Sequence, residues 1–367
     1  MFGLGQPKRR IETCDWPSAA QASIILPVLN EAGRIGRCLE SLIAQPEEVS
    51  EILVVDGGSS DGTQKIAADY RSLDTRVRLI DASPVDPCWT GKAWGLQFGL
   101  KESDPQSNWI LTVDADLSVS PKLVRSLLAH AGNTGVTTFS VATHQDLSGK
   151  LDALIHPPML TTLIYRYGSP GRAHRNLHRV QANGQCFLSR RQLLVDSNAF
   201  GAAKNSLCED ITIVRRLAEY GATVGFYECN GLAKVTMYNN WRETWNNWPR
   251  SLPMRDQYFG WREIVGLVGI LLFQALPLPT LVLGIIFGAP LFLLIFAIFL
   301  LLMRIGVLLG VARAYPKKPW TYWLSPIADL PVVTRIIQFA LRKRHNWRGR
   351  TYVRLKGGKF TPLVQSE

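Results

Sequence analysis

The six cysteines of this chain include no C-x-x-C pair, and none of its six histidines lies at ligand spacing from a cysteine pair. These absences exclude a zinc module of the usual spacing, and scattered thiols are typical of a reduced, cytosolic protein. Residues 1–21 carry three basic side chains at positions 8–10 without an apolar stretch after them. We therefore expect no signal peptide, and expect the following domain to stay on the side where it is made.

Charge is missing from one long stretch. Between Ile264 and Met303, 40 residues contain no charged side chain, and only Gln274 is strongly polar. A helix crosses the hydrocarbon core of a bilayer with about 20 apolar residues, so this stretch is long enough for two spans. We predict them at Ile264–Ile286 and Pro290–Val311, joined by a turn that returns the chain to its starting side.

Two features beside these spans leave alternatives open. Arg304 lies seven residues from the end of the second predicted span, where it can snorkel to the interface or serve a function. The segment Trp320–Leu341 contains Asp329, Arg335 and two prolines. We interpret this segment as interfacial, with a third span as the alternative.

Acidic residues are absent from residues 342–359, which contain eight lysines or arginines and account for much of the net charge of +12. Because this basic segment follows the apolar region, it indicates contact with anionic lipid headgroups on the cytoplasmic side rather than nucleic-acid binding. We expect a multi-pass membrane protein whose N-terminal domain and C-terminal tail both face the cytoplasm. The expected parts are an extension (1–21), a cytosolic domain (22–260), two spans (261–315) and an interfacial segment with a basic tail (316–367).

Residues 22–140 alternate short apolar runs with helical patterns. Strands are predicted at 23–26, 51–55, 77–80 and 109–113, and helices at about 31–44, from about 61, and after Ser120-Pro121. Continuous β-branched runs between amphipathic helices predict an α/β fold, a mostly parallel sheet with helices on both faces. In such sheets, ligands lie beyond the carboxyl ends of the strands.

Acidic residues follow two of these strands. Asp56 ends the second strand before Gly57-Gly58, which is typical of an ordinary turn or of close approach between backbone and ligand. Asp114 and Asp116 follow the fourth strand, and carboxylates so close repel each other unless a cation lies between them. Mg²⁺ or Mn²⁺ would suit these oxygen ligands and would also bridge a diphosphate; a solvated acidic loop is the alternative.

A third acidic site opens a later helix. Ser206-Leu207-Cys208-Glu209 has the pattern of a capping box, which would give Glu209 a structural role. Asp210 has no such explanation. It is our candidate general base, because a positioned carboxylate can deprotonate an attacking hydroxyl.

Taken in order, these motifs resemble family 2 glycosyltransferases of the GT-A fold over about residues 22–260. Ile25-Leu26-Pro27-Val28-Leu29-Asn30-Glu31 is similar to the family's first strand and nucleotide-binding turn. The resemblance implies that Pro27, Glu31 and Asp56 line the nucleoside of a nucleotide-sugar donor. It also implies that the D-x-D at residues 114–116 binds the divalent metal, and that Asp210 is the base of an inverting displacement.

Two cationic positions follow from the same resemblance. Trp89-Thr90-Gly91-Lys92 is similar to a segment of lipid-directed members, in which the lysine would face the donor phosphates. Many members carry Q-x-x-R-W near the membrane, whereas this chain has Trp248-Pro249-Arg250-Ser251-Leu252. Arg250 would still supply a cation for the leaving diphosphate, and the missing motif argues against a processive polymer synthase.

The acceptor is suggested by the segments near the membrane. Trp241, Trp245 and Trp248 recur on one helical face, as expected for core packing or for an aromatic stripe at headgroup depth beside the apolar segment 151–167. The W-x-x-W-P-R-S-L stretch most resembles carotenoid glycosyltransferases, and the ending Trp347-Arg348-Gly349-Arg350-x-Tyr352 resembles tails of ceramide-, hopanoid- and carotenoid-directed relatives.

The resemblance thus implies transfer of one sugar to the hydroxyl of a membrane lipid, with a hydroxylated carotenoid as the favoured acceptor. A hopanoid, a ceramide and a polyprenyl phosphate are alternatives. A non-catalytic membrane binding protein with a glycosyltransferase-like fold is the alternative from another class.

Overall fold

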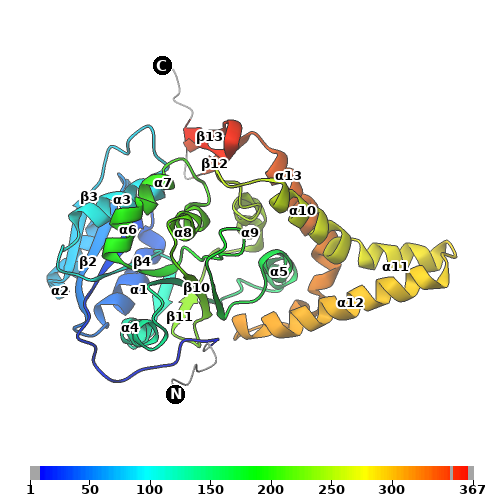
Figure 1. Ribbon diagram of the computed structural model, residues 1–367, viewed down its shortest axis with the longest axis horizontal. Coiled ribbons are helices and arrows are strands. Elements are labelled where there is room, and N and C mark those ends of the chain that lie inside the picture. Colours follow the sequence, from blue (N-terminus) through cyan, green and yellow to red (C-terminus); the bar gives the residue numbers. More distant parts are fainter. Residues whose placement is uncertain (1–8, 348–349, 363–367) are drawn as a thin grey trace.

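The computed structural model describes residues 9–347 and 350–362. Lys8 and Arg348, two basic residues considered above, lie outside the described residues. Figure 1 shows an α/β part, a pair of helices (α11 and α12) that projects away from it, and further helices between the two. The shape agrees with a globular domain joined to an apolar helical region.

An eight-stranded sheet forms the centre of the α/β part, in the order β3-β2-β1-β4-β9-β6-β10-β8. The neighbours β1–β2, β1–β4, β2–β3 and β6–β10 are parallel, whereas β9 runs antiparallel between β4 and β6. The predicted mostly parallel α/β fold is therefore confirmed. The strands are β1 (Ala22–Val28), β2 (Val49–Asp56), β3 (Val77–Asp81), β4 (Trp109–Val113), β6 (Thr138–Ala142), β8 (Arg172–His174), β9 (Cys186–Arg190) and β10 (Val224–Glu228).

Helices cover both faces because the strands bury side chains on both sides. In β1, Ile24 and Leu26 belong to one core cluster with helices α1 and α4, while Ile25 belongs to the other with α3, α7 and α8. The helices of this part are α1 (Ala32–Ile43), α2 (Thr63–Leu73), α3 (Gly91–Glu102), α4 (Leu123–Thr134), α6 (Arg191–Ser197), α7 (Ala199–Ala202) and α8 (Glu209–Glu219). A small sheet of β5 (Leu117–Val119), β11 (Ala233–Val235) and β7 (His144–Gln145) lies beside them.

Helix α3 packs unusually close to β1. A Cβ atom at Gly99 would lie 2.5 Å from Ile25 Cγ2, and one at Gly95 would lie 2.9 Å from Pro27 Cβ. The two glycines lie one turn apart on one face of α3, so the helix backbone rests directly on the strand. This contact fixes the N-terminal end of α3, which carries Lys92.

The apolar region begins with a bent helix. The predicted span Ile264–Ile286 is divided into α10 (Trp261–Ile270), a π-helical turn (Leu271–Ala275) and α11 (Pro277–Ile286), with a bend of 45°. Proline and a π-turn both interrupt the regular hydrogen bonds of a helix, which explains the bend. Helix α12 (Leu291–Val311) follows as predicted.

Among the described residues, two helices are long and apolar enough to cross a membrane, Leu291–Ala314 and Trp320–Leu341. The bent pair would make a third if it counts as one span. The second of these helices comprises η4 (Trp320–Ala328) and α13 (Asp329–Leu341), the segment that the sequence suggested to be interfacial. The number of spans stays a prediction.

A buried ion pair connects these helices. Arg304 of α12 donates from Nε to Asp329 Oδ2 at 2.8 Å and from Nη2 to Asp329 Oδ1 at 3.0 Å, and Gln274 Nε2 donates to the same carboxylate at 2.8 Å. Both charged side chains are almost fully buried. Because its charge is compensated inside the protein, Asp329 does not count against an apolar environment for α13.

The remaining elements connect the two regions. Helix α5 (Asp152–Tyr167) and the short α9 (Trp241–Asn247) with η1 (Trp248–Arg250) pack between the sheet and the apolar helices. After α13, a three-stranded antiparallel sheet of β12 (Arg344–Trp347), β13 (Arg350–Arg354) and β14 (Phe360–Pro362) follows.

Candidate active site

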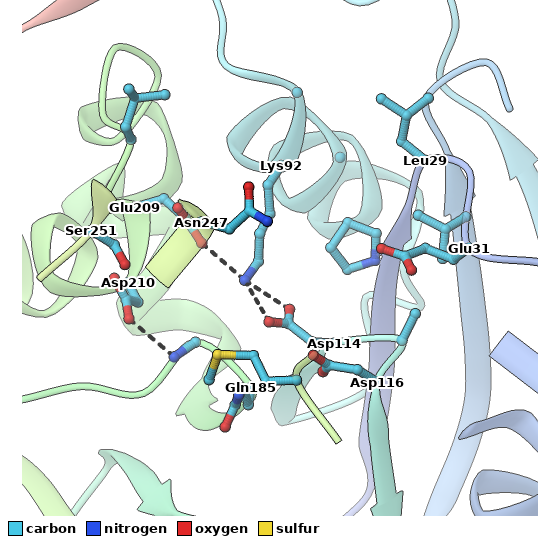
Figure 2. A pocket seen from close by; sticks show the side chains of 18 of the residues that line it. Leu29, Glu31, Lys92, Asp114, Asp116, Gln185, Glu209, Asp210, Asn247 and Ser251 are labelled. Carbon is cyan, nitrogen blue, oxygen red and sulfur yellow. Dashed lines mark hydrogen bonds and ion pairs between the residues drawn. The ribbon is translucent and has the colours of Figure 1, made fainter. Parts of the chain in front are cut away.

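A cavity of about 400 Å³ opens at the carboxyl ends of β1, β2 and β4, and it contains most of the predicted site residues. Figure 2 shows carboxylates from three separate segments around it. The predicted residues that line it are Pro27, Glu31, Lys92, Asp114, Asp116, Asp210 and Arg250. The strand-end rule therefore located the cavity correctly.

Asp56 is placed differently. It is fully buried, and its neighbours Val55 and Gly57 line the cavity while its own side chain is not among the lining groups. Its carboxylate accepts hydrogen bonds from the backbone of Gly58 and Ser59, from the Ser59 hydroxyl and from Gln64 Nε2. These contacts hold the glycine turn in shape, so the nucleoside contact of Asp56 stays a prediction.

Lys92 is the electrostatic centre of the cavity. Its Nζ lies 2.7 Å from Asp114 Oδ1 and 2.9 Å from Glu209 Oε1, so it joins the D-x-D to the N-terminal end of α8 (Figure 2). Burial disfavours the charged amine, but these two carboxylates outweigh burial and raise the pKa of Lys92 above its usual value. The side chain therefore remains a cation at neutral pH.

The capping-box prediction for Glu209 is wrong. Helix α8 begins at Glu209 with Cys208 as its N-cap, and no side chain caps it. Glu209 instead pairs with Lys92, while the Ser206 hydroxyl accepts from Cys208 N and bonds Thr212. Glu209 is thus a site residue that sequence reasoning missed, because its partner lies more than a hundred positions away.

Asp116 carries a sign of a cation site. Its Oδ1 is buried without a hydrogen-bond partner. Burial, followed by the charge of Asp114 and supported by Glu31, raises the pKa of Asp116 to about 8, against the opposing effect of Arg34. The neighbouring carboxylates of Asp114 and Asp116, with one orphaned oxygen, fit a hard divalent cation, which would favour their ionised forms.

Protein ligands alone would not complete such a site. Within the described ranges, no group of three or more His, Cys, Asp or Glu side chains is arranged to hold a metal. A cation at Asp114 and Asp116 would therefore share its coordination with water or with ligand oxygens, as Mg²⁺ commonly does.

Asp210 lies in the first turn of α8. Its Oδ2 accepts from Gly184 N at 3.2 Å (Figure 2), and its Oδ1 accepts from Ile211 N at 2.8 Å. Burial and then the charge of Glu209 raise the pKa of Asp210 to about 6, although Lys92 and the two backbone N–H groups oppose the rise. A carboxylate with this pKa is ionised near neutral pH and is basic enough to accept a proton.

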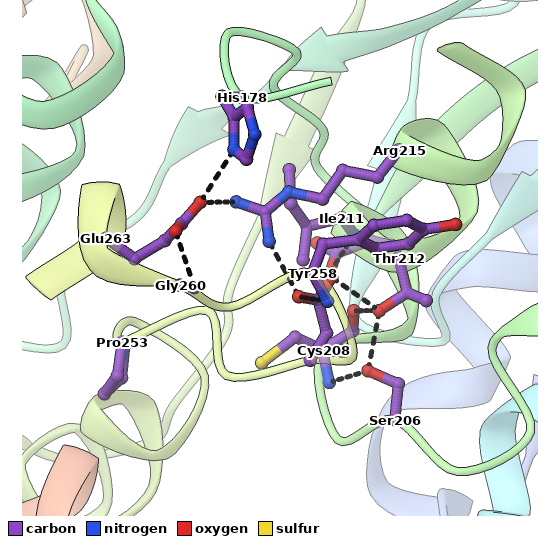
Figure 3. Close-up of polar contacts among 12 residues, drawn as sticks. His178, Ser206, Cys208, Ile211, Thr212, Arg215, Pro253, Tyr258, Gly260 and Glu263 are labelled. Carbon is purple, nitrogen blue, oxygen red and sulfur yellow. Dashed lines mark hydrogen bonds and ion pairs between the residues drawn. The ribbon is translucent and has the colours of Figure 1, made fainter. Parts of the chain in front are cut away.

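A buried polar network connects α8 to the segment that leads into α10 (Figure 3). Arg215, which is fully buried, donates to Asp256 Oδ1 at 2.7 Å and to Glu263 Oε1 at 3.0 Å. Thr212 of the same helix donates to Asp256 Oδ2, and His178 lies 3.3 Å from Glu263. The helix that carries Asp210 is thereby fixed to the loop before α10 and to the first turn of α10 itself.

A second, larger cavity adjoins the first. It has a volume of about 920 Å³ and is lined by α5 side chains such as Leu160 and Ile164, and by the C-terminal end of α12, including Val307 and Val311. The two cavities share Asn183, Gln185, Asp210, Met237, Trp248 and Ser251. Asp210 therefore lies where the carboxylate-lined cavity meets a cavity with a mostly apolar lining.

The three tryptophans predicted to share one helical face differ in burial, which bears on whether they pack in the core or form an aromatic stripe at headgroup depth. Trp248 is buried and Trp245 packs against the same core cluster, whereas Trp241 is 37% exposed. Core packing thus explains two of the three side chains. Trp248 also lines both cavities, and its ring lies 4.1 Å from that of His156.

The eight-stranded sheet, with paired carboxylates after β4, is a GT-A-like α/β fold. Residues 23–195 match the family model described as Glycosyl transferase family 2, so the chain carries a family 2 glycosyltransferase domain. Among solved structures, the mannosyltransferase PcManGT from Pyrobaculum calidifontis, in complex with GDP-Man and Mn²⁺, has a TM-score of 0.57 and 14% identity. That likeness covers 92% of this chain and 90% of that chain, and it shows the fold alone.

Curated relatives match shorter stretches. A lipopolysaccharide core biosynthesis glycosyltransferase of Rhizobium meliloti is 36% identical over 107 residues, or 29% of this chain and 35% of that protein. The 4,4'-diaponeurosporenoate glycosyltransferase of Staphylococcus aureus is 35% identical over 96 residues, or 26% of this chain and 24% of that protein. The chain thus matches about a third or less of the length of these relatives.

Proposed function

We propose that this protein transfers one sugar from a nucleotide-sugar donor to the hydroxyl of a membrane lipid, with inversion at the anomeric carbon. The observation that carries the proposal is the junction of the two cavities at Asp210. The carboxylate-lined cavity suits a charged donor, and the apolar cavity suits a lipid. A soluble acceptor would not require the second cavity.

The donor diphosphate would lie between Lys92, Arg250 and the D-x-D carboxylates. Asp114 and Asp116 would hold a Mg²⁺ or Mn²⁺ ion, which supplies positive charge to the diphosphate oxygens when bound. The solved mannosyltransferase contains GDP-Man and Mn²⁺, which is consistent with this assignment. Lys92 and Arg250 would stabilise the negative charge that grows on the departing nucleoside diphosphate.

Asp210 would accept the proton of the acceptor hydroxyl. As that oxygen attacks the anomeric carbon, the bond to the diphosphate breaks on the opposite face, and one displacement inverts the centre. The carboxylate lies at the shared wall of the two cavities, where a lipid hydroxyl would meet the sugar. The backbone N–H groups of Gly184 and Ile211 hold its orientation.

The acceptor would enter from the bilayer. Helix α12, a candidate membrane span, lines the apolar cavity with its C-terminal end, so a lipid would not need to leave an apolar environment. We favour a hydroxylated carotenoid. The short match to the 4,4'-diaponeurosporenoate glycosyltransferase supports the carotenoid skeleton, whereas that relative is named for a carboxylate rather than a hydroxyl. The catalytic domain and tail would face the cytoplasm.

The test uses the full-length protein in lipid nanodiscs with Mn²⁺ and a panel of nucleotide sugars. Hydroxylated carotenoid, hopanoid, ceramide and polyprenyl phosphate are supplied separately, and products are identified by mass spectrometry. We expect one glycosylated lipid from the native protein and none from Asp210→Asn. Binding of a nucleotide sugar without transfer or hydrolysis would instead indicate a non-catalytic binding protein.

A further inference from the structure

The C-terminal sheet (β12–β14) packs on the catalytic domain beside the donor cavity. Tyr352 and Phe360 are buried and form a small cluster with Leu207, which precedes α8. Phe360 N donates to Asn205 O at 2.8 Å. The basic tail, which the sequence suggested as a contact for lipid headgroups, therefore has a protein contact as well.

The other side of this sheet is held by α13. Arg354 NH1 donates to Ala340 O at 2.7 Å, and the ring of His345 lies 6.0 Å from Phe339 and 5.4 Å from Phe360. In Figure 1, β12 and β13 lie at the C-terminal end of α13. The sheet thus connects an apolar helix to the wall of the donor cavity.

Two side chains of β13 line that cavity, Arg350 and Tyr352. Burial raises the pKa of the Tyr352 phenol, and Arg350 and the backbone of Gly91 act against this rise, so both lie close to the phenol. Gly91 is the first residue of α3 and directly precedes Lys92. Tyr352 and Arg350 therefore line the cavity together with Gly91 and Lys92, at the end of α3 that carries the central lysine.

The charges of this wall suit an anion. Arg350 comes from β13, Arg250 from η1 and Lys92 from α3, and all three line one cavity. Lys92 is already shared by Asp114 and Glu209. A diphosphate carries more negative charge than one shared ammonium neutralises, and guanidinium groups bind phosphate oxygens through two parallel hydrogen bonds.

We infer that the C-terminal sheet completes the donor site, with Arg350 binding the diphosphate of the nucleotide sugar and Tyr352 acting as its positioning residue. This inference rests on the proposed function. The donor site would then include residues of β13, which follow the apolar helices in the sequence. Arg250 and Arg350 together would then bind the leaving diphosphate, the role that the resemblance assigns to the Q-x-x-R-W motif in many family members.

The test measures binding of UDP, GDP, dTDP and ADP, each with Mn²⁺, to the detergent-purified full-length protein by calorimetry. For the nucleotide that binds the native protein, Arg350→Gln should weaken binding about tenfold or more, because a charge-assisted contact is lost. Tyr352→Phe keeps the packing against Leu207 and Phe360, and should weaken binding less. It should also raise the donor KM with little change in kcat.

Arg344→Gln is the matched control, because Arg344 is an exposed basic residue of the same sheet. It should bind the nucleotide like the native protein, and Tm measurements should show that all three variants are folded. Native binding by Arg350→Gln, with Asp114→Asn impaired, would overturn the inference and leave the proposed function standing. If none of the four nucleotides binds the native protein, the proposed function and this inference both fail.

Discussion

Asp210 should lower the stability of the protein while it supplies the base of the reaction. Its pKa is raised from 3.8 to about 6, mainly by burial and by Glu209. The folded state therefore disfavours the ionised carboxylate relative to the unfolded chain. At 1.36 kcal/mol per pKa unit, a rise of this size corresponds to a cost on the order of 3 kcal/mol at neutral pH.

The perturbation is Asp210→Asn, which keeps the shape and removes the charge. Above pH 6 the native protein bears the full cost of the buried charge, so the variant should be more stable by up to about 3 kcal/mol. The difference should shrink as the pH falls from 6 towards 4, because Asp210 becomes protonated in the folded state first. Asp69→Asn, at an exposed position of α2, should show no such gain.

The same variant should lower kcat by about 10²–10⁴-fold, since the acceptor hydroxyl loses its base. The assay combines thermal unfolding in detergent at pH 8, 6.5 and 5 with kcat measured on the native acceptor. In the native protein, kcat should fall as the pH drops through about 6. Glu209→Gln should move this fall to lower pH, because it removes the neighbouring negative charge.

Two results would refute the reasoning. A stability gain that is equal at pH 8 and pH 5 would show that the buried charge is not its cause. A kcat close to that of the native protein in Asp210→Asn would show that Asp210 is not the base, and that the two cavities meet at a residue without a catalytic role.

Four further predictions concern the metal, the nucleoside, the acceptor and the topology. Asp114→Asn and Asp116→Asn should each weaken Mn²⁺ and donor binding together, and full activity in EDTA would contradict a metal at these residues. Asp56→Asn should raise the donor KM more than it lowers kcat, and an unchanged KM would exclude a nucleoside contact. Ile164→Trp should narrow the apolar cavity and reduce lipid glycosylation while donor hydrolysis persists; equal loss of both would argue against an acceptor role for this cavity. Protease added to sealed, cytosol-out vesicles should remove both the catalytic domain and an epitope appended to the C-terminus, and protection of the epitope alone would indicate a third span.

Much of the fold and of the first cavity was predictable from local patterns. The β-branched runs became β1–β4, with β4 at Trp109–Val113 as predicted, because buried strands need apolar side chains on both faces. The rule that ligands lie beyond the strand ends pointed to Asp114 and Asp116, and the family resemblance pointed to Pro27; all three line the cavity.

What the sequence could not provide was pairing between distant residues. Glu209 matched a local capping pattern, yet its partner Lys92 is brought to it only by the packing of α3. Arg304 and Asp329 were considered as separate charges, whereas they form one buried pair. Arg350 was seen only within a basic tail and in an ending similar to those of lipid-directed relatives, because nothing in residues 342–359 indicates that β13 lines the cavity beside Lys92.

The Arg215 network has a consequence for where the chain can be cut. Arg215 lies in α8 and Glu263 in α10, the helix that begins the apolar region, so the change of environment near residue 260 is not a break in packing. A truncated protein that ends before Trp261 would leave the buried guanidinium with Asp256 as its remaining acidic partner, and removing one partner of a buried pair commonly costs about 3–5 kcal/mol. A water-soluble fragment of residues 22–260 should therefore be less stable than the same part of the full-length protein, and replacing Arg215 alone would not restore it, because the buried Asp256 would then lose its partner. Surface charge added to such a fragment would not compensate, because the loss lies beneath α8.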